Sequence, residues 1–589
     1  MILNILFFAW CPFTQGTTYF VDASGGNDEN NGLSANSPWK TLAKINSSKF
    51  APGDTILLRR GSTWREQLNF PSSGSAGSPI VIDAYASGEL PIISGADLMP
   101  AGAWSACNPC GRNIWAAPLK AKTNVVIFDG AKGNRKSSST ELSGPGDWFW
   151  DSGTLYIFSS GEPSATFQHP GIESGARPSG LNLTGVANVT VKNISISGAN
   201  AIPYGEGAGI FAITVHLEGP TPQNLILSHV IVSNGAGDGI HIENANHCSL
   251  DSVLVHDNEG AGIELYHSNG KFPITSGSIT NSEIHHNGFN GIFLVGCPRG
   301  ERCRSVVYPD GLTITNIQIT GNKVHDNGAG IYLHETNDSL ISGNLSYSNT
   351  NTTRKGEGYC VGLSGSSGNI VEKNDCYKAR LAGIELSIDT GRPPFGSSEN
   401  IIRYNLVHDD GTHGIFTNYD PSQHNRILHN LIYNHPQGAC VMANFIRHEI
   451  ENNTCFNSRI GIHLYVSSTT RKTGSITVKN NIFVNSSLHH VLIEKGVEGP
   501  FDFSSNDYYP DGSSAFNWKG SPFNFAGWRD TSGQEARSIL ENPAFRASVP
   551  VRPLDFVLRP GSPALGKGAD ISWEIGANSA KYTADQRKQ

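Results

Sequence analysis

A short fragment recurs through the middle of the chain: a small residue, an apolar residue, a variable residue, a second apolar residue and a second variable residue. Clear copies are GDGIHIENA from Gly237 and GAGIYLHET from Gly328. Counted from the small residue, the copies begin at positions 239, 262, 291, 330, 360, 383, 414, 440 and 461. Steps of this size are typical of a solenoid, in which each repeat forms one layer and stacks on the next.

The intervals between the repeats favour strands and turns. The chain holds 66 glycines, and only 16% of its residues are charged. Asn, Ser, Thr and Gly separate short Ile, Leu and Val runs, which is the pattern of an all-β protein. The formal charge of -8 includes no basic block, which argues against a nucleic-acid or anionic-membrane partner. We expect a monomer.

The first residues indicate export. Residues 2–10 form an apolar run too short to span a bilayer, and a polar stretch follows it. We interpret residues 1–16 as a signal peptide and the protein as secreted, with a buried first strand as the alternative. Ten cysteines agree with export, and the spacings of Cys107 with Cys110 and of Cys297 with Cys303 suit disulfides. Cys376 and Cys455 fall at inward positions, which predicts plain core residues.

Five segments follow from the pattern. After the signal, residues 17–98 contain first rungs and a helix expected over Trp39–Ile45, which would plug the open apolar end. Residues 99–175 are a Trp-rich insertion that we expect to be a β-hairpin. The rungs occupy 176–500, and residues 501–589 abandon the period as a closing cap and tail.

The entry segment carries a family resemblance. VDASGGNDENNG, PWKTL, PGDTI and SPIVIDAY with PIISG resemble the start of secreted right-handed parallel β-helix proteins of the pectate-lyase-like superfamily. The resemblance covers nearly the whole chain and implies an all-β fold: a right-handed parallel β-helix solenoid with an N-terminal cap helix and a β-hairpin insertion. Lyases, hydrolases, epimerases and adhesins share this fold, so it does not select a reaction.

Two sets of side chains can be interpreted either structurally or functionally. The insertion's Trp104, Trp115, Trp148 and Trp150 could stack on sugar rings, but we favour packing of the insertion onto the solenoid. A ladder of asparagines, each just before an apolar pair, is expected to hold turns and to bond neighbouring rungs. Its members are Asn281, Asn322, Asn344, Asn374, Asn405, Asn430, Asn453 and Asn481.

Strand alternation assigns two outward columns to the repeated fragment. The first is His241, Glu264, Phe293, Tyr332, Gly362, Glu385, Phe416, Met442 and His463. The second is Glu243, Tyr266, Val295, His334, Ser364, Ser387, Asn418, Asn444 and Tyr465.

Acids, imidazoles and rings in one face are typical of a sugar-binding groove. Long additions at 267–276, 296–312, 390–399 and 466–475 all follow this strand, and we expect them to form walls along the groove. The predicted partner is therefore a polysaccharide or oligosaccharide. Its predicted binding residues are His241, Glu264, Tyr266, Tyr332, His334, His413, Phe416, Asn418 and His463.

The acids suggest hydrolysis of a glycosidic bond. Asp389 and Asp420 fall at the same register on neighbouring rungs, which lie about 4.8 Å apart. Carboxyl pairs near that separation serve glycosidases, one as acid and one as nucleophile or base. We expect Asp389, Asp420, Glu385 and Glu335 to carry the reaction, in that order, and no cofactor to be required. Alternatively, these acids bind calcium or are solvated turn residues; no metal ligand is assigned.

Two other functions stay open. The sequence from Asp238 to Ile242 resembles the acid-bearing motif of polygalacturonases, but the next rung has Ala261 and Gly262 where that family has paired aspartates. A polysaccharide lyase, with calcium assistance and a Tyr or His base, is the second candidate, although the outward columns contain no Lys or Arg. A glycan-binding adhesin without catalysis is the third.

Overall fold

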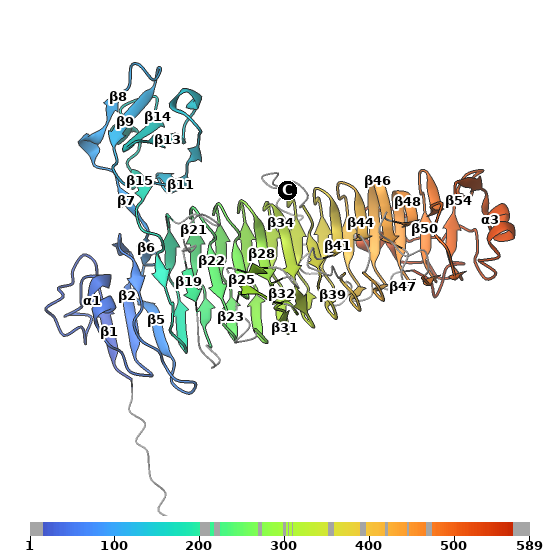
Figure 1. Cartoon of the computed structure of the whole chain (residues 1–589), viewed down its shortest axis with the longest axis horizontal. Coiled ribbons are helices and arrows are strands. Elements are labelled where there is room, and N and C mark those ends of the chain that lie inside the picture. The colour runs from blue at the N-terminus through green and yellow to red at the C-terminus, as the bar shows by residue number, and fades with distance from the viewer. Residues whose placement is uncertain are drawn as a thin grey trace, which may run out of the picture.

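The solenoid dominates the molecule (Figure 1). The computed structural model describes residues 16–200, 213–216, 224–268, 274–297, 302–303, 306–308, 310–350, 358–388, 396–418, 422–444, 447–466 and 474–568. Nearly all of the predicted signal peptide lies outside these residues. Within them, no helix is both long enough and apolar enough to cross a membrane.

One face of the solenoid is a 15-stranded sheet in which every pairing is parallel. Each strand begins a rung and pairs with strands one rung before and after. In order they are β1 (Thr18–Val21), β2 (Thr55–Arg59), β5 (Ile80–Tyr85), β17 (Val189–Lys192), β20 (Ile226–Ser228), β23 (Cys248–Asp251), β26 (Gly277–Thr280), β32 (Ile317–Thr320), β36 (Leu340–Ser342), β39 (Ile370–Glu372), β42 (Ile401–Arg403), β45 (Arg426–Leu428), β47 (His448–Glu451), β49 (Ile476–Lys479) and β52 (Phe501–Ser504).

A second strand in each rung forms a second column. It comprises β3 (Thr63–Trp64), β6 (Ile92–Ser94), β18 (Ser195–Ser197), β21 (Ile231–Ser233), β24 (Leu254–His256), β27 (Glu283–His285), β33 (Lys323–His325), β37 (Leu345–Tyr347), β40 (Asp375–Tyr377), β43 (Leu406–His408), β46 (Leu431–Asn444), β48 (Thr454–Tyr465), β50 (Ile482–Val484) and β53 (Asp507–Tyr509).

The repeated fragment forms the third column, which we call the groove column. It contains β4 (Leu68–Asn69), β16 (Leu181–Asn182), β19 (Ile213–His216), β22 (Ile240–Glu243), β25 (Ile263–Tyr266), β28 (Asn290–Val295), β34 (Ala329–His334), β38 (Val361–Ser364), β41 (Ala382–Ser387), β44 (His413–Thr417), the second halves of β46 and β48, β51 (His489–Ile493) and β54 (Phe516–Trp518). The chain is a right-handed parallel β-helix, and this prediction is confirmed.

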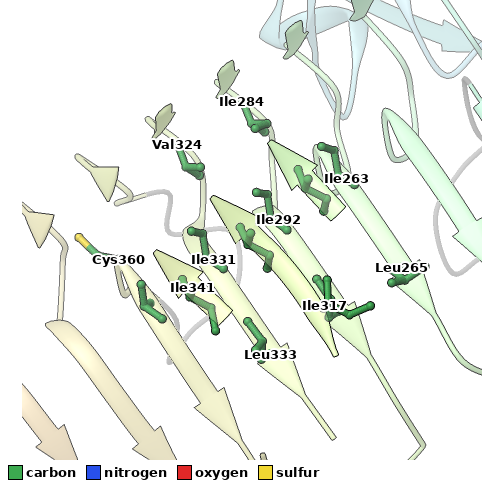
Figure 2. Packing of buried hydrophobic residues seen from close by; sticks show 14 of the residues in the cluster. Ile263, Leu265, Ile284, Ile292, Ile317, Val324, Ile331, Leu333, Ile341 and Cys360 are labelled. Carbon is green, nitrogen blue, oxygen red and sulfur yellow. The ribbon is translucent and has the colours of Figure 1, made fainter. Parts of the chain in front are cut away.

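Inward residues of successive rungs stack into a continuous apolar core. Ile263, Ile292 and Ile331 follow one another in register (Figure 2). Val361 continues the series, and all four side chains are 0 to 1% exposed. Each rung therefore buries its apolar side only because another rung covers it.

The cysteines follow the prediction in part. Cys107 is bonded to Cys110, and Cys297 is disulfide-bonded. Cys376 is a buried free thiol, as expected. The interpretation of Cys455 as a plain core residue is wrong, because it is bonded to Cys440 with their Cα atoms 5.8 Å apart. The two residues lie in β46 and β48, so the bond ties neighbouring rungs together.

The asparagine ladder forms, with one member displaced. From Asn322 to Asn481, each side-chain amide donates to the Oδ1 atom of the next member at 2.9–3.0 Å. Asn506 extends the ladder. Asn281 does not belong to it, because Asn281 adopts the left-handed conformation (φ 51°) and the next residue, Ser282, takes the ladder position. The left-handed turn residue thus precedes the ladder residue rather than being it.

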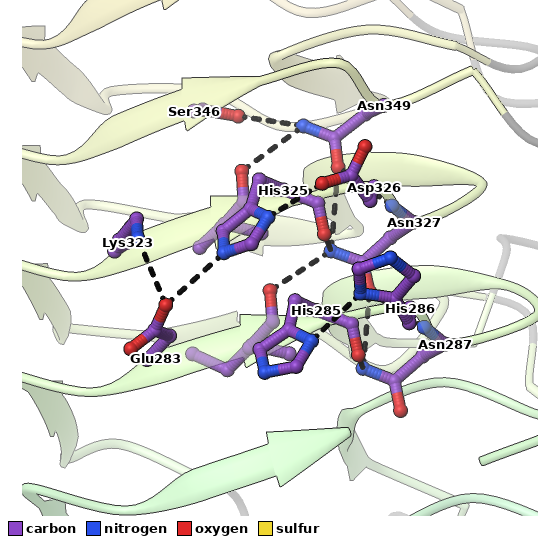
Figure 3. A network of polar contacts seen from close by, with 12 residues as sticks. Glu283, His285, His286, Asn287, Lys323, His325, Asp326, Asn327, Ser346 and Asn349 are labelled. Atoms are coloured by element: carbon purple, nitrogen blue, oxygen red, sulfur yellow. Dashed lines mark hydrogen bonds and ion pairs between the residues drawn. The ribbon is translucent and has the colours of Figure 1, made fainter. Parts of the chain in front are cut away.

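Two further stacks lie at the second turn, between the second column and the groove column. Asn258, Asn287, Asn327 and Asn349 form another amide ladder, part of which is seen in Figure 3. Outward rings of the second column stack with centroids 4.7–5.0 Å apart. The stacked rings are His256, His285, His325, Tyr347, Tyr377, His408 and Tyr433.

Both ends of the solenoid are covered. At the N-terminal end, α1 (Leu42–Ser47) buries Leu42 and Ile45. The helix begins later than predicted because the Thr41 hydroxyl caps it by accepting a hydrogen bond from the Lys44 amide. At the other end, α3 (Phe525–Ser532) places Trp528, 0% exposed, over the last rung.

The insertion is larger than a single hairpin. The predicted hairpin is present as β13 (Asp147–Asp151) and β14 (Thr154–Phe158). It joins β8 (Ser105–Ala106), β9 (Ile114–Pro118) and β12 (Asn134–Arg135) in a five-stranded sheet. A four-stranded sheet of β7 (Ala96–Leu98), β10 (Val126–Phe128), β11 (Ala131–Lys132) and β15 (Ile172–Gly175) lies between it and the solenoid (Figure 1).

Candidate active site

Strand register places the predicted outward column as expected. His241 pairs with Glu264, then Phe293, Tyr332, Gly362, Glu385, Phe416, Met442 and His463 follow on successive rungs. The second predicted column also forms from Glu243 through Ser387. Register is fixed because a slip of one residue would expose the inward Ile and Leu side chains.

The densest group of acids on this face lies at its N-terminal end. The His241 Nδ1 atom on β22 lies 2.6 Å from the Glu264 Oε2 atom on β25 and 3.7 Å from the Asp238 Oδ2 atom. Glu243 approaches the other imidazole nitrogen, with Oε2 3.9 Å from Nε2. One ligand atom from each of Asp238, His241 and Glu264 can be chosen so that all three lie within 4.8 Å of one another.

Asp238 reaches this group from the turn before β22. Its Oδ1 atom accepts a hydrogen bond of 2.6 Å from the Ala261 amide of the next rung, which fixes the carboxyl beside the groove column. Its Oδ2 atom is buried and accepts no hydrogen bond from any described residue, although it faces His241. The side chains of Asp238, Glu264 and His241 therefore form a compact buried cluster, which we call the acid–imidazole cluster.

Burial perturbs both kinds of group in this cluster. Asp238 is 2% exposed, and loss of water together with the nearby Glu264 charge raises the pKa of its carboxyl to about 7. Burial alone would lower the pKa of His241, but the surrounding Asp238, Glu243 and Glu264 carboxyls raise it well above 6.5. At neutral pH the imidazole is therefore charged, and Asp238 retains a proton in a large fraction of molecules.

Polar side chains of the following turn support the acids. The Ser268 hydroxyl donates to Glu243, and Asn244 and Ser268 hydrogen-bond each other through side chain and backbone. Tyr266 borders the cluster, with its ring centroid 6.3 Å from that of His241. Of the predicted binding residues, His241, Glu264 and Tyr266 thus come together here.

A second group lies farther along the same face. Asn418 donates to the Glu385 Oε1 atom at 3.0 Å, and the His413 and Phe416 rings lie 5.1 Å apart. The pKa of Glu385 is raised overall, because the effect of burial exceeds the opposing effect of hydrogen bonds from the Tyr359 and Asn418 side chains. Burial and the nearby His463 and His435 lower the pKa of His413 to about 4.

The two groups do not share one site. Glu264 and Glu385 are separated by four rung steps, which is about 19 Å at about 4.8 Å per step. Phe293 and Tyr332 occupy the rungs between them, with centroids 5.7 Å apart, and His334 lies beside Tyr332. At the far end, His463 is held by Glu494, whose Oε1 atom lies 2.8 Å from Nε2.

The predicted catalytic acids have different outcomes. Asp389 and Asp420 lie outside the described residues, so their pairing stays a prediction. Glu385 faces outward on β41 and is 4% exposed. Glu335 does not face outward: it is 0% exposed and adopts the left-handed conformation (φ 52°) directly after β34. The prediction that Glu335 is an outward acid is therefore wrong, because the alternation of inward and outward residues ends with β34 at His334.

Sequence reasoning gave Asp238 no role because the neighbouring rung lacks paired aspartates. The structure supplies the second carboxyl from Glu264, which sits two residues further along that rung. The predicted outward column already indicates part of this cluster, because His241 and Glu264 are neighbours in it. Only the turn geometry, which directs Asp238 toward the next rung, was missing.

A family model shows the fold family of the chain. A family model described as "Right handed beta helix region" matches residues 149–298 and 238–447, which together cover half of the chain. A lacto-N-biosidase of Bifidobacterium longum subsp. longum is 43% identical over 76 residues. This stretch is 12% of the present chain and 5% of that enzyme, so the match spans about a twentieth of the relative.

Three solved structures match the chain at low identity and with TM-scores below 0.5. XylC in complex with xylose is 15% identical, with coverage of 90% of this chain and 87% of XylC and a TM-score of 0.43. The native GH136 lacto-N-biosidase from Eubacterium ramulus is 15% identical, with coverage of 79% and 67% and a TM-score of 0.37. Pectate lyase Pel9A is 13% identical, with coverage of 80% of each chain and a TM-score of 0.37.

Proposed function

The chain belongs to the family of right-handed β-helix proteins, and from this premise we propose that it is a carbohydrate-active enzyme, specifically a glycoside hydrolase. The observation that carries the proposal is the acid–imidazole cluster, in which the Asp238 carboxyl from the turn before β22 meets the outward Glu264 carboxyl of the groove column. The stretch shared with a lacto-N-biosidase supports the same reaction class. The substrate is an oligosaccharide or polysaccharide.

The two carboxyls differ in the way that glycosidase chemistry requires. With a pKa of about 7, Asp238 holds a proton that it can donate to the leaving glycosidic oxygen. Glu264 faces the charged His241, which favours its carboxylate form for attack on the anomeric carbon. Water then cleaves the glycosyl–enzyme ester, and Asp238 takes a proton from that water.

Carboxyl separation favours retention of configuration. An oxygen of Asp238 and an oxygen of Glu264 lie within 4.8 Å of each other, which is closer than the roughly 6.5 to 9.5 Å that separates the carboxyls of inverting enzymes. Both acids are at most 3% exposed. This low exposure keeps bulk water away from the two carboxyls.

The same cluster disfavours the two other candidates. A lyase needs a neutral base and a positive environment for the uronate carboxylate, whereas His241 is protonated and three acids surround it. An adhesin binds sugars without needing a buried acid whose pKa is moved to neutrality. Calcium would be held by oxygen ligands, and the three-residue cluster includes an imidazole in place of one of them.

The test begins with a panel of neutral and acidic plant, algal and animal glycans. New reducing ends without ultraviolet absorbance would support hydrolysis, whereas the absorbance of an unsaturated uronate would identify a lyase and refute the proposal. On the active substrate, Asp238→Asn and Glu264→Gln should each lose at least about a hundredfold in rate.

Three further variants sharpen this test. Glu449→Gln is the control, because Glu449 is an exposed acid on β47 of the 15-stranded sheet, and it should retain activity. Asp389→Asn and Asp420→Asn test the acids predicted from sequence. Loss of activity in these two variants, with full activity in Asp238→Asn, would move the site away from the acid–imidazole cluster.

A further inference from the structure

The insertion contains a cavity that the proposed reaction does not use. Its volume is about 270 Å³, and it opens between β7 with the following short helix η1 (Ala101–Ala103) and the segment from α2 (Pro163–Thr166) to β15. Most of its lining is apolar. The residues that contribute side chains of this kind are Leu98, Met99, Trp104, Phe167, Pro170 and Ile172.

Trp104 differs from the other three tryptophans that the sequence singled out. Trp148 is 1% exposed in the core of the insertion. The indole N–H groups of Trp115 and Trp150 donate to the Ser159 and Leu119 carbonyls. Packing within the insertion's own core therefore accounts for these three, and the prediction that they pack the insertion onto the solenoid is wrong. Trp104 is half-buried, lines the cavity, and donates its indole N–H to no residue in the described part of the chain.

Polar groups stand beside this aromatic wall. Gln168 is exposed at the cavity, and its amide Nε2 atom donates to the Ala165 carbonyl, which orients the side chain and leaves Oε1 as an acceptor. The Ser164 hydroxyl donates to the Ala101 carbonyl across the cavity wall. An aromatic face with a few fixed acceptors matches a pyranose ring, whose C–H face is apolar and whose edge carries hydroxyl donors.

The insertion is joined to the solenoid beside the acid–imidazole cluster. Val125 and Ile127 pack against Ala236, two residues before Asp238. Lys132 forms an ion pair of 3.0 Å with Glu259, in the turn before β25, and Asn234 donates to the Gly130 carbonyl. These contacts hold the insertion at the N-terminal end of the groove column.

We propose that the cavity is an accessory sugar subsite, in which one pyranose ring of the glycan stacks on Trp104 and donates a hydroxyl hydrogen bond to Gln168. This inference rests on the proposed function, since it takes the substrate to be a glycan. It adds a binding site outside the acid–imidazole cluster. A chain that occupies both sites would be held by two contacts, which raises its local concentration at the acids without altering the chemical step.

Direct binding tests the subsite independently of catalysis. The full chain is titrated with free glucose, galactose, xylose, N-acetylglucosamine and N-acetylgalactosamine, each as a separate probe, by calorimetry and tryptophan fluorescence. At least one sugar should bind, and Trp104→Ala should weaken that binding at least about tenfold, a loss of about 1.4 kcal/mol. Trp104→Phe, which retains an aromatic face, should restore part of the affinity.

Phe149→Ala is the matched control, because Phe149 is a half-buried aromatic residue of the same insertion whose ring lies against Tyr156 and not in the cavity. It should bind like the unmodified chain. The proposal is overturned when no probe binds, or when Trp104→Ala and Phe149→Ala bind alike. If the chain binds a sugar through Trp104 but hydrolyses no glycan, the proposed function is rejected and the accessory subsite is not.

Kinetics give a second readout on the substrate identified above. Trp104→Ala should raise KM for glycans long enough to span both sites and leave kcat unchanged, because the stacked ring takes no part in bond cleavage. KM for the shortest cleaved oligosaccharide should not change. Equal effects on short and long substrates would contradict an accessory subsite.

Discussion

Replacement of one ladder asparagine should weaken the solenoid locally and by a calculable amount. Asn374 is 0% exposed. Its side-chain amide donates to the Ile341 carbonyl at 2.9 Å and to the Asn405 Oδ1 atom at 3.0 Å. Its Oδ1 atom accepts from the backbone and side-chain nitrogens of Asn344. Asn374→Ala removes all four bonds and leaves the buried Asn344 amide without this partner.

At about 1 kcal/mol per lost hydrogen bond, the variant should lose about 4 kcal/mol of local stability. A single unfolding midpoint is a poor measure, because stacked repeats open in parts. Native-state hydrogen exchange resolves the effect: amides of β36, β37, β39 and β40 should exchange several hundredfold faster, while β1 and β2 keep their rates.

The control is Gln318→Ala, which removes an exposed amide of β32 that forms no side-chain hydrogen bond with any described residue. It should change stability by less than about 0.5 kcal/mol. If Asn374→Ala falls within that same limit, or if the loss of protection is uniform along the solenoid, the ladder does not stabilise individual rungs as argued.

Three other outcomes are expected. The rate of the proposed hydrolysis should fall as pH rises through about 7, because Asp238 then loses the proton that it donates, and a profile flat to pH 9 would contradict that role. Cys440→Ser with Cys455→Ser should cost about 3 kcal/mol in denaturant unfolding, because the bond closes a loop of 15 residues, and an unchanged unfolding midpoint would contradict this. Burial and the neighbouring His256, His325 and His286 lower the pKa of His285 to about 4, so its contribution to stability is complete above pH 6.5 and declines toward pH 4. His285→Phe should therefore reduce the fall in Tm between pH 6.5 and pH 4. Parallel plots of Tm against pH for the variant and the unmodified chain would refute the reasoning.

Most of the architecture could be read from the chain because the information is local and repeated. A small residue followed by alternating apolar residues occurs often enough to set the strand, its inward face and its register at once. Hence the repeat predicts His241, Glu264 and Glu385 in one column, and the structure pairs the rungs between them accordingly. The asparagine ladder was found by the same repetition, apart from the shift from Asn281 to Ser282.

The errors lie where repetition ends. Glu335 was placed by extending the alternation beyond β34, but a left-handed residue there turns the chain and buries the side chain. Cys455 lies in a regular position, and its partner Cys440 became apparent only when the rungs were stacked. The sequence also gave no reason to separate Trp104 from the other three tryptophans, because their difference is the cavity beside one of them.

The chain's own pattern therefore determined the solenoid, its stacked core and the residues that face outward from the groove column. Tertiary structure decided which of those residues act together. Asp238 lies in a turn, outside any periodic column, and a hydrogen bond to the Ala261 amide brings its carboxyl to His241 and Glu264. Burial then moves its pKa to about 7. Desolvation and contacts between rungs depend on what surrounds a residue in space, which the order of residues alone does not reveal.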